Sequence, residues 1–237
     1  MNAPTSANVG VDATNVSSNR VSKSALSCSQ HSIADAIPLR AITMTKPSIV
    51  GISGSLSDPS RTSVLVKAVL TAIERETGYA SSFIELSDAA PALFQSRSPK
   101  DLSVTGKAFV HRVEQADLLV VGTPVYRASY TGALKHLFDL VDHRHFSNKP
   151  VVLTATGGSP LHGLMIDHQL RPLFGFLQAL SLPTTVYAVE SDFSNYAISN
   201  PDIEERIARV GVEASTYLKR RTNQANGSHE APLAAIA

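Results

Sequence analysis

Hydroxyl side chains are concentrated in one short segment, Gly51-Ile-Ser-Gly-Ser-Leu-Ser-Asp-Pro-Ser-Arg-Thr62. A phosphate monoester is bound by several donors that converge on its oxygens, and hydroxyls and the backbone N–H groups of a helix start supply such donors. Gly54 permits close approach of the backbone, and Arg61 adds positive charge. The segment indicates an anion site, although a polar turn that only caps a helix would look similar. The hydroxyls belong to Ser53, Ser55, Ser60 and Thr62.

Other phosphate-binding and nucleophilic motifs do not fit this segment. It lacks Gly-x-Gly-x-x-Gly, so the dinucleotide-binding fingerprint is absent, and it lacks Gly-Lys-Ser/Thr, which excludes an NTPase loop. A nucleophile elbow requires a glycine two residues after its serine, and Ser55 stands there instead. Of the functions considered for this segment, the binding of an anion is therefore the one that fits.

Strands and helices that would position the segment alternate along the chain. Short apolar runs predict strands over 48–53, 82–86, 118–122, 150–155 and 184–189. Apolar residues at spacings of three and four predict a helix across 64–73. Further helices are expected over about 101–115, across a segment that carries Leu134, Leu137, Phe138 and Val141, and over 161–180 and about 201–220. Caps are expected at Ser60 or Thr62, Gly78 and Asn200, and a long loop through Pro91 and Pro99 follows the second strand.

This alternation predicts one α/β domain, a doubly wound five-stranded parallel sheet with helices on both faces. In such a sheet, ligands bind at the carboxyl ends of the strands, where the strand order reverses. The hydroxyl-rich segment follows the first strand and so lies at this edge. The domain is expected over 46–221, with a C-terminal tail over 222–237.

Composition excludes several other classes of protein. The chain of 237 residues carries a formal net charge of +1 with dispersed Lys and Arg, which provides no surface for nucleic acid. No apolar run approaches the roughly 20 residues that span a bilayer. Cys28 is the single cysteine and cannot form an internal disulfide, so a reducing cytoplasm is expected.

The first 45 residues are rich in Ser, Asn, Ala and Thr and predict a disordered extension. Met44 stands just before the first strand, so an upstream-extended gene model is the alternative to a real tail. The extension lacks the pattern of a secretory signal.

Two further loops resemble a known family. They are Gly122-Thr-Pro-Val-Tyr-Arg-Ala-Ser-Tyr-Thr-Gly-Ala-Leu-Lys135, after the third strand, and Ala155-Thr-Gly-Gly-Ser-Pro-Leu-His162, after the fourth. With the hydroxyl-rich segment they resemble the flavodoxin-like NAD(P)H-dependent FMN reductases. The nearest likeness is to the branch that supplies reduced FMN to two-component sulfonate monooxygenases. The resemblance covers about residues 46–195.

The resemblance implies how FMN would be held. The hydroxyl-rich segment would bind its phosphate, the loop after the third strand would line the ring and ribityl chain, and Thr156, Gly157 and Gly158 would face the pyrimidine side. Pro and Gly let backbone lie close to a flat ring. The implied cofactor-binding residues are Ser53, Gly54, Ser55, Ser60, Arg61, Thr62, Pro124, Val125, Tyr126, Tyr130, Thr156, Gly157, Gly158 and His162.

Three positions leave alternatives open. Ser57 stands where the family often has Arg, so Arg61 would carry the phosphate charge instead. Tyr130 corresponds to a residue inserted as a π-bulge in the sulfonate-linked branch, where the resemblance associates it with exchangeable flavin and a tetramer. It would otherwise simply pack at a helix start. His162 would touch flavin, nicotinamide or a neighbouring subunit, or be structural.

Hydride transfer to flavin needs stacking and exclusion of water, so no catalytic acid, base or nucleophile is expected. His136, His143 and His145 lack metal-ligand spacing and are interpreted as solvated surface residues.

The leading hypothesis is therefore an NADH- or NADPH-dependent FMN reductase, a homodimer or homotetramer, that feeds a flavin-dependent monooxygenase. One alternative keeps FMN bound to reduce quinones, azo dyes or metal oxyanions. The other is a non-enzymatic electron carrier, which the charge of +1 disfavours because such carriers are strongly acidic.

Overall fold

The computed structural model describes residues 46–227, with side chains described through residue 220. Its main sheet is parallel and has the strand order β2–β1–β3–β4, with a final position beside β4. This is the flavodoxin-like order of a doubly wound fold. The strands are β1 (Ile49–Ser53), β2 (Ser81–Glu85), β3 (Leu118–Pro124), β4 (Pro150–Gly157), β5 (Leu180–Ser181) and β6 (Val186–Val189).

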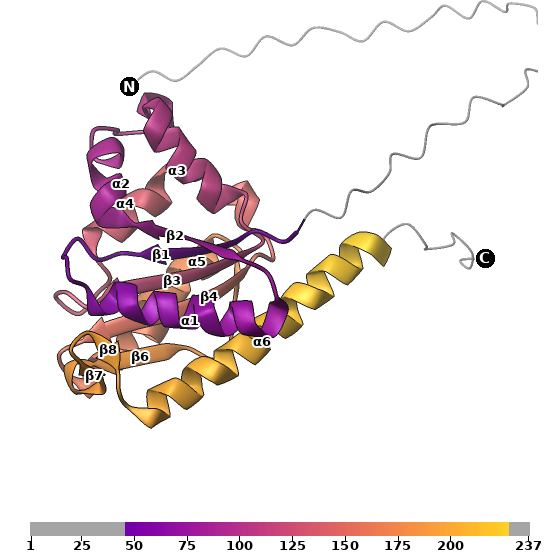
Figure 1. The fold of residues 1–237 in the computed structure, drawn as a ribbon. Coiled ribbons are helices and arrows are strands. Elements are labelled where there is room, and N and C mark those ends of the chain that lie inside the picture. Colours follow the sequence, from indigo (N-terminus) through magenta and orange to yellow (C-terminus); the bar gives the residue numbers. More distant parts are fainter. Residues whose placement is uncertain (1–45, 228–237) are drawn as a thin grey trace, which may run out of the picture. The chain divides into compact units, whose positions relative to one another are not determined.

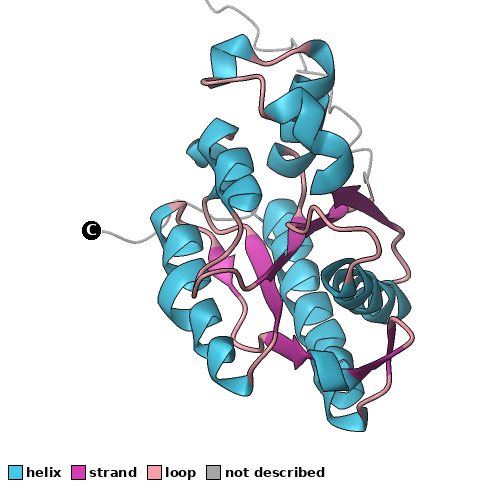
Figure 2. Ribbon diagram, turned by 90° about the vertical axis from the view of Figure 1, so that its left-hand side faces the viewer, coloured by secondary structure: helices cyan, strands magenta, loops and turns pink. Residues whose placement is uncertain are grey.

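Helices cover both faces of this sheet (Figures 1 and 2). Side chains of α1 and α6 share one apolar cluster with the sheet, and side chains of α2, α3, α4 and α5 share the other. The helices are α1 (Arg61–Thr77), α2 (Leu86–Leu93), α3 (Val104–Glu114), α4 (Gly132–Leu140), α5 (Arg171–Phe176) and α6 (Pro201–Gly227). Among the described residues, none of these helices is both long and apolar enough to cross a membrane.

The central strands are buried on both faces because their side chains alternate between the two clusters. In β3, Leu119 and Val121 enter one cluster, whereas Leu118 and Val120 enter the other. A fully buried Leu or Val contributes about 1.5–3 kcal/mol relative to exposure. The predicted α/β sheet with helices on both faces is confirmed.

The fifth position of the sheet is occupied by two short segments instead of one strand. Both β5 and β6 pair with β4, at Pro150–Val151 and at Thr154–Gly157 respectively. The residues between them, 182–185, include Pro183, which has no backbone N–H to donate to a ladder. The predicted strand over 184–189 corresponds to β6.

The segment predicted as a long loop after β2 contains α2, so that prediction is wrong there. Leu86, Ala89 and Leu93 are buried at spacings of three and four. Their packing favours a helix even though Pro91 lies within it, at a position where a proline is normally unfavourable. Tertiary burial has overridden the local signal.

Two predicted helices differ in extent from the observed ones. The segment 161–180 is divided into a 3₁₀ helix (Pro160–Leu164), a π-helix (Ile166–Leu170) and the short α5. The last helix starts at Pro201, with the Asn200 side chain accepting from Asp202 N at 3.0 Å as expected, but it continues to Gly227.

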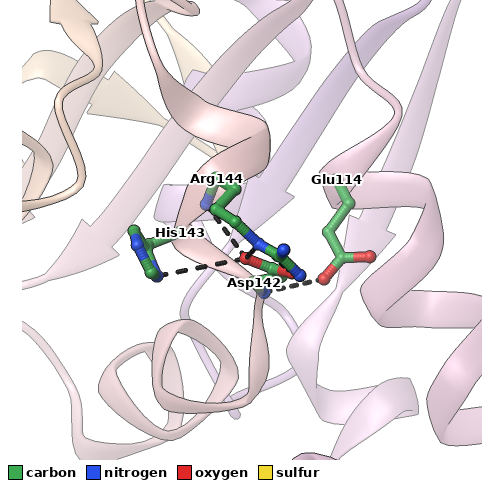
Figure 3. A network of polar contacts seen from close by, with 4 residues as sticks. All are labelled: Glu114, Asp142, His143 and Arg144. Carbon is green, nitrogen blue, oxygen red and sulfur yellow. Dashed lines mark hydrogen bonds and ion pairs between the residues drawn. The ribbon is translucent and has the colours of Figure 1, made fainter. Parts of the chain in front are cut away.

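The amino ends of the strands carry a group of charged residues, here called the amino-end cluster: Glu114, Asp142, His143, Arg144 and Lys149. Asp142 accepts from the Arg144 side chain and backbone, and its own N–H donates to Glu114 Oε1 at 2.8 Å (Figure 3). The Arg144 hydrogen bonds hold the pKa of Asp142 well below its usual range. Lys149 is fully buried, and its Nζ donates to the carbonyls of Val113 and Glu114 at 3.1 and 2.7 Å.

Candidate functional site

A cleft opens at the carboxyl ends of the strands, where the loops after β1, β3, β4 and β6 meet. The pairing Ser53↔Gly122 and Pro124↔Thr156 brings the first three loops to one level of the sheet. This is the edge expected for a ligand in a doubly wound fold. The cleft is lined by Ser55, Ser57, Pro59, Ser60, Arg61, Thr62, Pro124, Val125, Tyr126, Thr156, Gly157, Gly158, Val189, Glu190 and Tyr196.

The β1–α1 loop holds its hydroxyls in a hydrogen-bonded arrangement. Ser63 Oγ donates to the buried Ser53 Oγ at 2.9 Å, and Ser57 N donates to Ser55 Oγ at 3.2 Å. Ser60 is the N-cap of α1, as predicted, and accepts from Ser63 N at 3.2 Å. The first turn of α1 contains no acidic residue, so the positive end of the helix dipole faces the cleft without a competing carboxylate from its own turn.

Close contacts with the neighbouring strand fix the backbone of this loop. Gly54 N donates to the Gly122 carbonyl at 2.7 Å, and the Thr131 hydroxyl donates to the Gly54 carbonyl at 2.8 Å. A Cβ at Gly54 would lie 3.1 Å from the Gly122 oxygen. A glycine at this position therefore favours the close approach of the two backbones, and the two hydrogen bonds tie the loop to β3 and to the start of α4.

The loop after β3 forms one wall of the cleft. Val125 N donates to the Thr156 carbonyl at 2.7 Å, which ties this wall to β4. Tyr126 and Ser129 exchange backbone hydrogen bonds across a tight turn, whose central residues Arg127 and Ala128 have φ values of 51° and 64°. Left-handed backbone at two successive non-glycine residues is uncommon and concentrates at functional loops. The turn leaves Tyr126 55% exposed at the cleft.

The loop after β4 is held mainly by Tyr187 of β6. The Tyr187 hydroxyl donates to the Ser159 carbonyl at 2.6 Å, and burial raises the pKa of this phenol. A Cβ at Gly157 would lie 2.3 Å from the Tyr187 hydroxyl oxygen. The absence of a side chain at Gly157 therefore makes room for this tyrosine, which sets the position of the Gly157–Ser159 backbone.

A fourth wall comes from the segment after β6, which the sequence did not indicate as part of the site. Glu190 forms an ion pair with Arg61, and the Arg61 guanidinium carbon lies 5.4 Å from the centre of the Tyr196 ring. Tyr196 belongs to the turn between β7 (Phe193–Ser194) and β8 (Ala197–Ile198). The available signal was topological, because this segment follows a parallel strand and must emerge at the same edge.

The predicted cofactor residues fall into three groups. Most of them line the cleft: Ser55, Ser60, Arg61, Thr62, Pro124, Val125, Tyr126, Thr156, Gly157 and Gly158. Ser53 and Gly54 lie beneath it and support the loop. Tyr130 and His162 are outside the lining, and His162 is exposed on the 3₁₀ helix after β4.

The π-bulge expected at Tyr130 is not present there. The α4 helix begins only at Gly132, because Thr131 is its N-cap and accepts from Leu134 N at 3.2 Å. Tyr130 lies in the preceding loop and packs partly buried against the core. The π-helix of the described region is Ile166–Leu170 instead, so the predicted π-bulge at Tyr130 is wrong.

The charged lining of the cleft consists of Arg61 and Glu190, and hydroxyls supply the remaining polarity. Thr62 and Thr156 extend the hydroxyl set across the cleft, with their oxygens 2.6 Å apart.

Within residues 46–220, no three His, Cys, Asp or Glu side chains form a possible metal site. His143 and His145 are exposed, while His136 is half-buried with Nε2 3.0 Å from the Leu93 carbonyl. Cys28 lies outside the described residues.

The strand order defines a flavodoxin-like fold, and the cleft lies at the carboxyl edge of its sheet. Residues 47–194 match the family model described as NADPH-dependent FMN reductase. The chain therefore belongs to the NADPH-dependent FMN reductase family, and it is an oxidoreductase that uses a nicotinamide cofactor and FMN.

Individual relatives agree with this family. An NADH-dependent FMN reductase, SfnF, from Pseudomonas fluorescens is 45% identical over 82% of this chain and 100% of its own length. An FMN reductase (NADPH) from Pseudomonas aeruginosa is 47% identical over 74% of this chain and 94% of its own. Among solved structures, an oxidoreductase from Corynebacterium diphtheriae matches with a TM-score of 0.63 at 32% identity, covering 73% of this chain and 97% of that one.

Proposed function

We propose that this cleft binds FMN, that NADH or NADPH reduces it there, and that the reduced FMN leaves for a flavin-dependent monooxygenase. The observation that carries the proposal is the junction of a hydroxyl-lined helix start with two loops of Pro and Gly at one end of the sheet. A phosphate suits the first part, and a flat ring suits the second. The family and its named relatives support the same reaction.

Different residues of the cleft are proposed to contact different parts of FMN. Ser55, Ser60 and Thr62 would donate to the phosphate with the N-terminal N–H groups of α1, and Arg61 would add charge. Pro124, Val125 and Tyr126 would lie along the ring and ribityl chain. Backbone at Gly157 and Gly158 would lie near the pyrimidine side, where donors stabilise negative charge on the reduced ring.

FMN supplies the electron-accepting chemistry when bound, and the protein needs to orient the two cofactors and exclude water. Among the described residues that line the cleft, none is a His, Cys or Lys. Its hydroxyls, backbone groups and one ion pair are suited to binding and orientation, and we assign no general acid or base. Tyr126, half-exposed at the rim, would cover the ring while leaving room for the nicotinamide.

The finer assignments follow from the resemblance in the sequence. A monooxygenase of a two-component sulfonate system is the proposed recipient of reduced FMN, and a homodimer or homotetramer is the proposed assembly. The proposed compartment, the cytoplasm, rests instead on the single cysteine, Cys28. Relatives with names that specify NADH and NADPH are both similar to this chain, so the nucleotide is left to measurement.

The test is steady-state oxidation of NADH and of NADPH with and without added FMN, FAD and riboflavin. The proposal requires that the purified protein be mostly colourless and that oxidation depend on added flavin. Activity that persists without added flavin but needs a quinone or azo dye would instead indicate a tightly bound FMN. No oxidation of either nucleotide in excess FMN would contradict reductase activity altogether.

A further inference from the structure

Arg61, the cation expected to meet the FMN phosphate, is already paired with a carboxylate from another loop. Its guanidinium contacts Glu190 and lies against the Tyr196 ring, and both partners line the same cleft. Arg61 opens α1 immediately after its N-cap, whereas Glu190 follows β6. Two loops far apart in sequence thus meet across the phosphate end of the cleft.

Glu190 is held in place by its own segment. The buried Asp192 carboxylate accepts from Val189 N at 2.7 Å and from Asn200 Nδ2 at 2.6 Å. The Phe193↔Ile198 pairing closes the β7–β8 hairpin, which lies between Asp192 and Asn200 in the chain. This bracing joins both ends of the segment, so Glu190 and Tyr196 are presented to Arg61 by a defined backbone.

A carboxylate at this place opposes the binding of a phosphate. A phosphate monoester carries a charge of about −1.5 to −2 near pH 7, so Glu190 repels it and also occupies the guanidinium that would bind it. The ion pair itself contributes little to stability, because the two side chains are 38% and 73% exposed. The ion pair should therefore affect the binding of a phosphate more than the stability of the fold.

We propose that Glu190 weakens FMN binding by competing with the flavin phosphate for Arg61, and so keeps the flavin exchangeable. The inference rests on the proposed function, because it concerns the phosphate end of the FMN site. Binding of the phosphate replaces the Glu190 carboxylate on at least part of the guanidinium, and release of FMN restores the pair. Tyr196 keeps the guanidinium at the cleft in both situations.

The experiment compares FMN with riboflavin, which lacks the phosphate, in wild type and Glu190→Gln. We expect the Kd for FMN to fall by about three- to tenfold in E190Q with slower FMN dissociation, while the Kd for riboflavin stays the same. The difference should shrink between about 0.02 M and 0.5 M salt, because screening weakens charge repulsion at a half-exposed site. Flavin fluorescence gives the affinities, and stopped flow gives the dissociation rates.

A matched control removes an equivalent carboxylate away from the cleft. Glu205 on α6 is 75% exposed and pairs with Arg209 at 3.1 Å, so Glu205→Gln changes the net charge equally. The E205Q variant should bind both flavins as wild type does. Thermal unfolding of all three proteins verifies that each is folded.

The alternative outcomes separate cleanly. Weaker or unchanged FMN binding in E190Q would overturn the proposal, the weaker case showing that Glu190 positions Arg61 for the phosphate. An equal change for FMN and riboflavin would also overturn it, because the effect would not pass through the phosphate. If wild type binds FMN and reduces it, such results leave the proposed function standing; if it binds neither flavin, the proposed function itself fails.

Discussion

Charged side chains gather at both ends of the sheet, but they make different kinds of contact. In the amino-end cluster, Lys149 donates to two backbone carbonyls, and Asp142 exchanges bonds with backbone and side chains of its neighbours. At the carboxyl end, Arg61 and Glu190 contact each other and an aromatic ring across an open cleft.

The two groups of charges therefore differ in what their removal should change, namely the stability of the fold or the affinity for a ligand. Charged side chains that form hydrogen bonds with backbone groups stabilise the fold, and removing such a side chain leaves a buried polar group without a donor. Charges that satisfy only each other can change partners when a ligand arrives, at little cost in stability. Substitutions at the amino end should therefore change stability without changing flavin affinity, and substitutions at the cleft should change affinity.

Lys149→Met should produce the largest loss of stability. The variant keeps the length of the side chain but removes the donor to the last carbonyls of α3, at a cost of about 3 kcal/mol. Thermal unfolding should show a Tm lower by about 10 °C, with FMN and riboflavin affinities unchanged in the folded protein. Lys67→Met is the control, because the Lys67 side chain is 56% exposed and pairs with Glu85 at 3.3 Å. A similar loss in both variants would contradict a special role for the buried ammonium.

Gly122→Ala should lower both the stability of the fold and the affinity for flavin, because Gly122 lies on β3 next to Thr62 of the cleft lining. A Cβ there would lie 2.3 Å from Val66 Cγ2 and 2.8 Å from Thr154 Oγ1. Such overpacking costs about 1–3 kcal/mol, and it would push on Thr62 at the phosphate end. Denaturant unfolding measures the stability. Gly175→Ala on α5, where a Cβ meets nothing within 4 Å, should be neutral or stabilising, and an equal loss there would refute the steric explanation.

Tyr187→Phe should lower the affinity for flavin more clearly than it lowers the stability of the fold. Loss of the bond to the Ser159 carbonyl costs about 1 kcal/mol in stability. Because Tyr187 positions the loop proposed to meet the ring, the affinities for FMN and riboflavin should fall together, by about three- to tenfold. Tyr79→Phe, on the other face of the sheet, is the matched control. A change limited to FMN would show that Tyr187 acts at the phosphate instead.

Acid titration should give the smallest effect, confined to the amino-end cluster. The pKa of Asp142 is held below its usual value in the folded protein by Arg144, so its stabilisation is complete above about pH 4 and is lost as the pH falls below that value. Wild type should therefore exceed Asp142→Asn in urea midpoint at pH 7, and the gap should narrow toward pH 3. A constant gap would show that the Arg144 contact has no electrostatic part.

Local sequence signals predicted the main strands, most of the helices and the β1–α1 loop of the cleft, whereas the loops after β3 and β4 were expected from the family resemblance. Apolar runs at β1 and β3 and the caps at Ser60 and Gly78 depend on neighbours in sequence, and each was placed correctly. The interior of α2 and the pairing of Arg61 with Glu190 depend on contacts between distant segments. Periodicity carries no information about such contacts, which is why the fourth wall was missed.

The division of the last sheet position into β5 and β6 has a consequence for association between chains. A continuous outer strand presents a row of unpaired amides and carbonyls on which another chain can add a strand. Here the row is broken after Ser181, and Pro183 removes one donor from the gap. The interruption that precedes β6, the strand that carries Tyr187 and leads to Glu190, thus also leaves this edge poorly suited to templating fibrous aggregation.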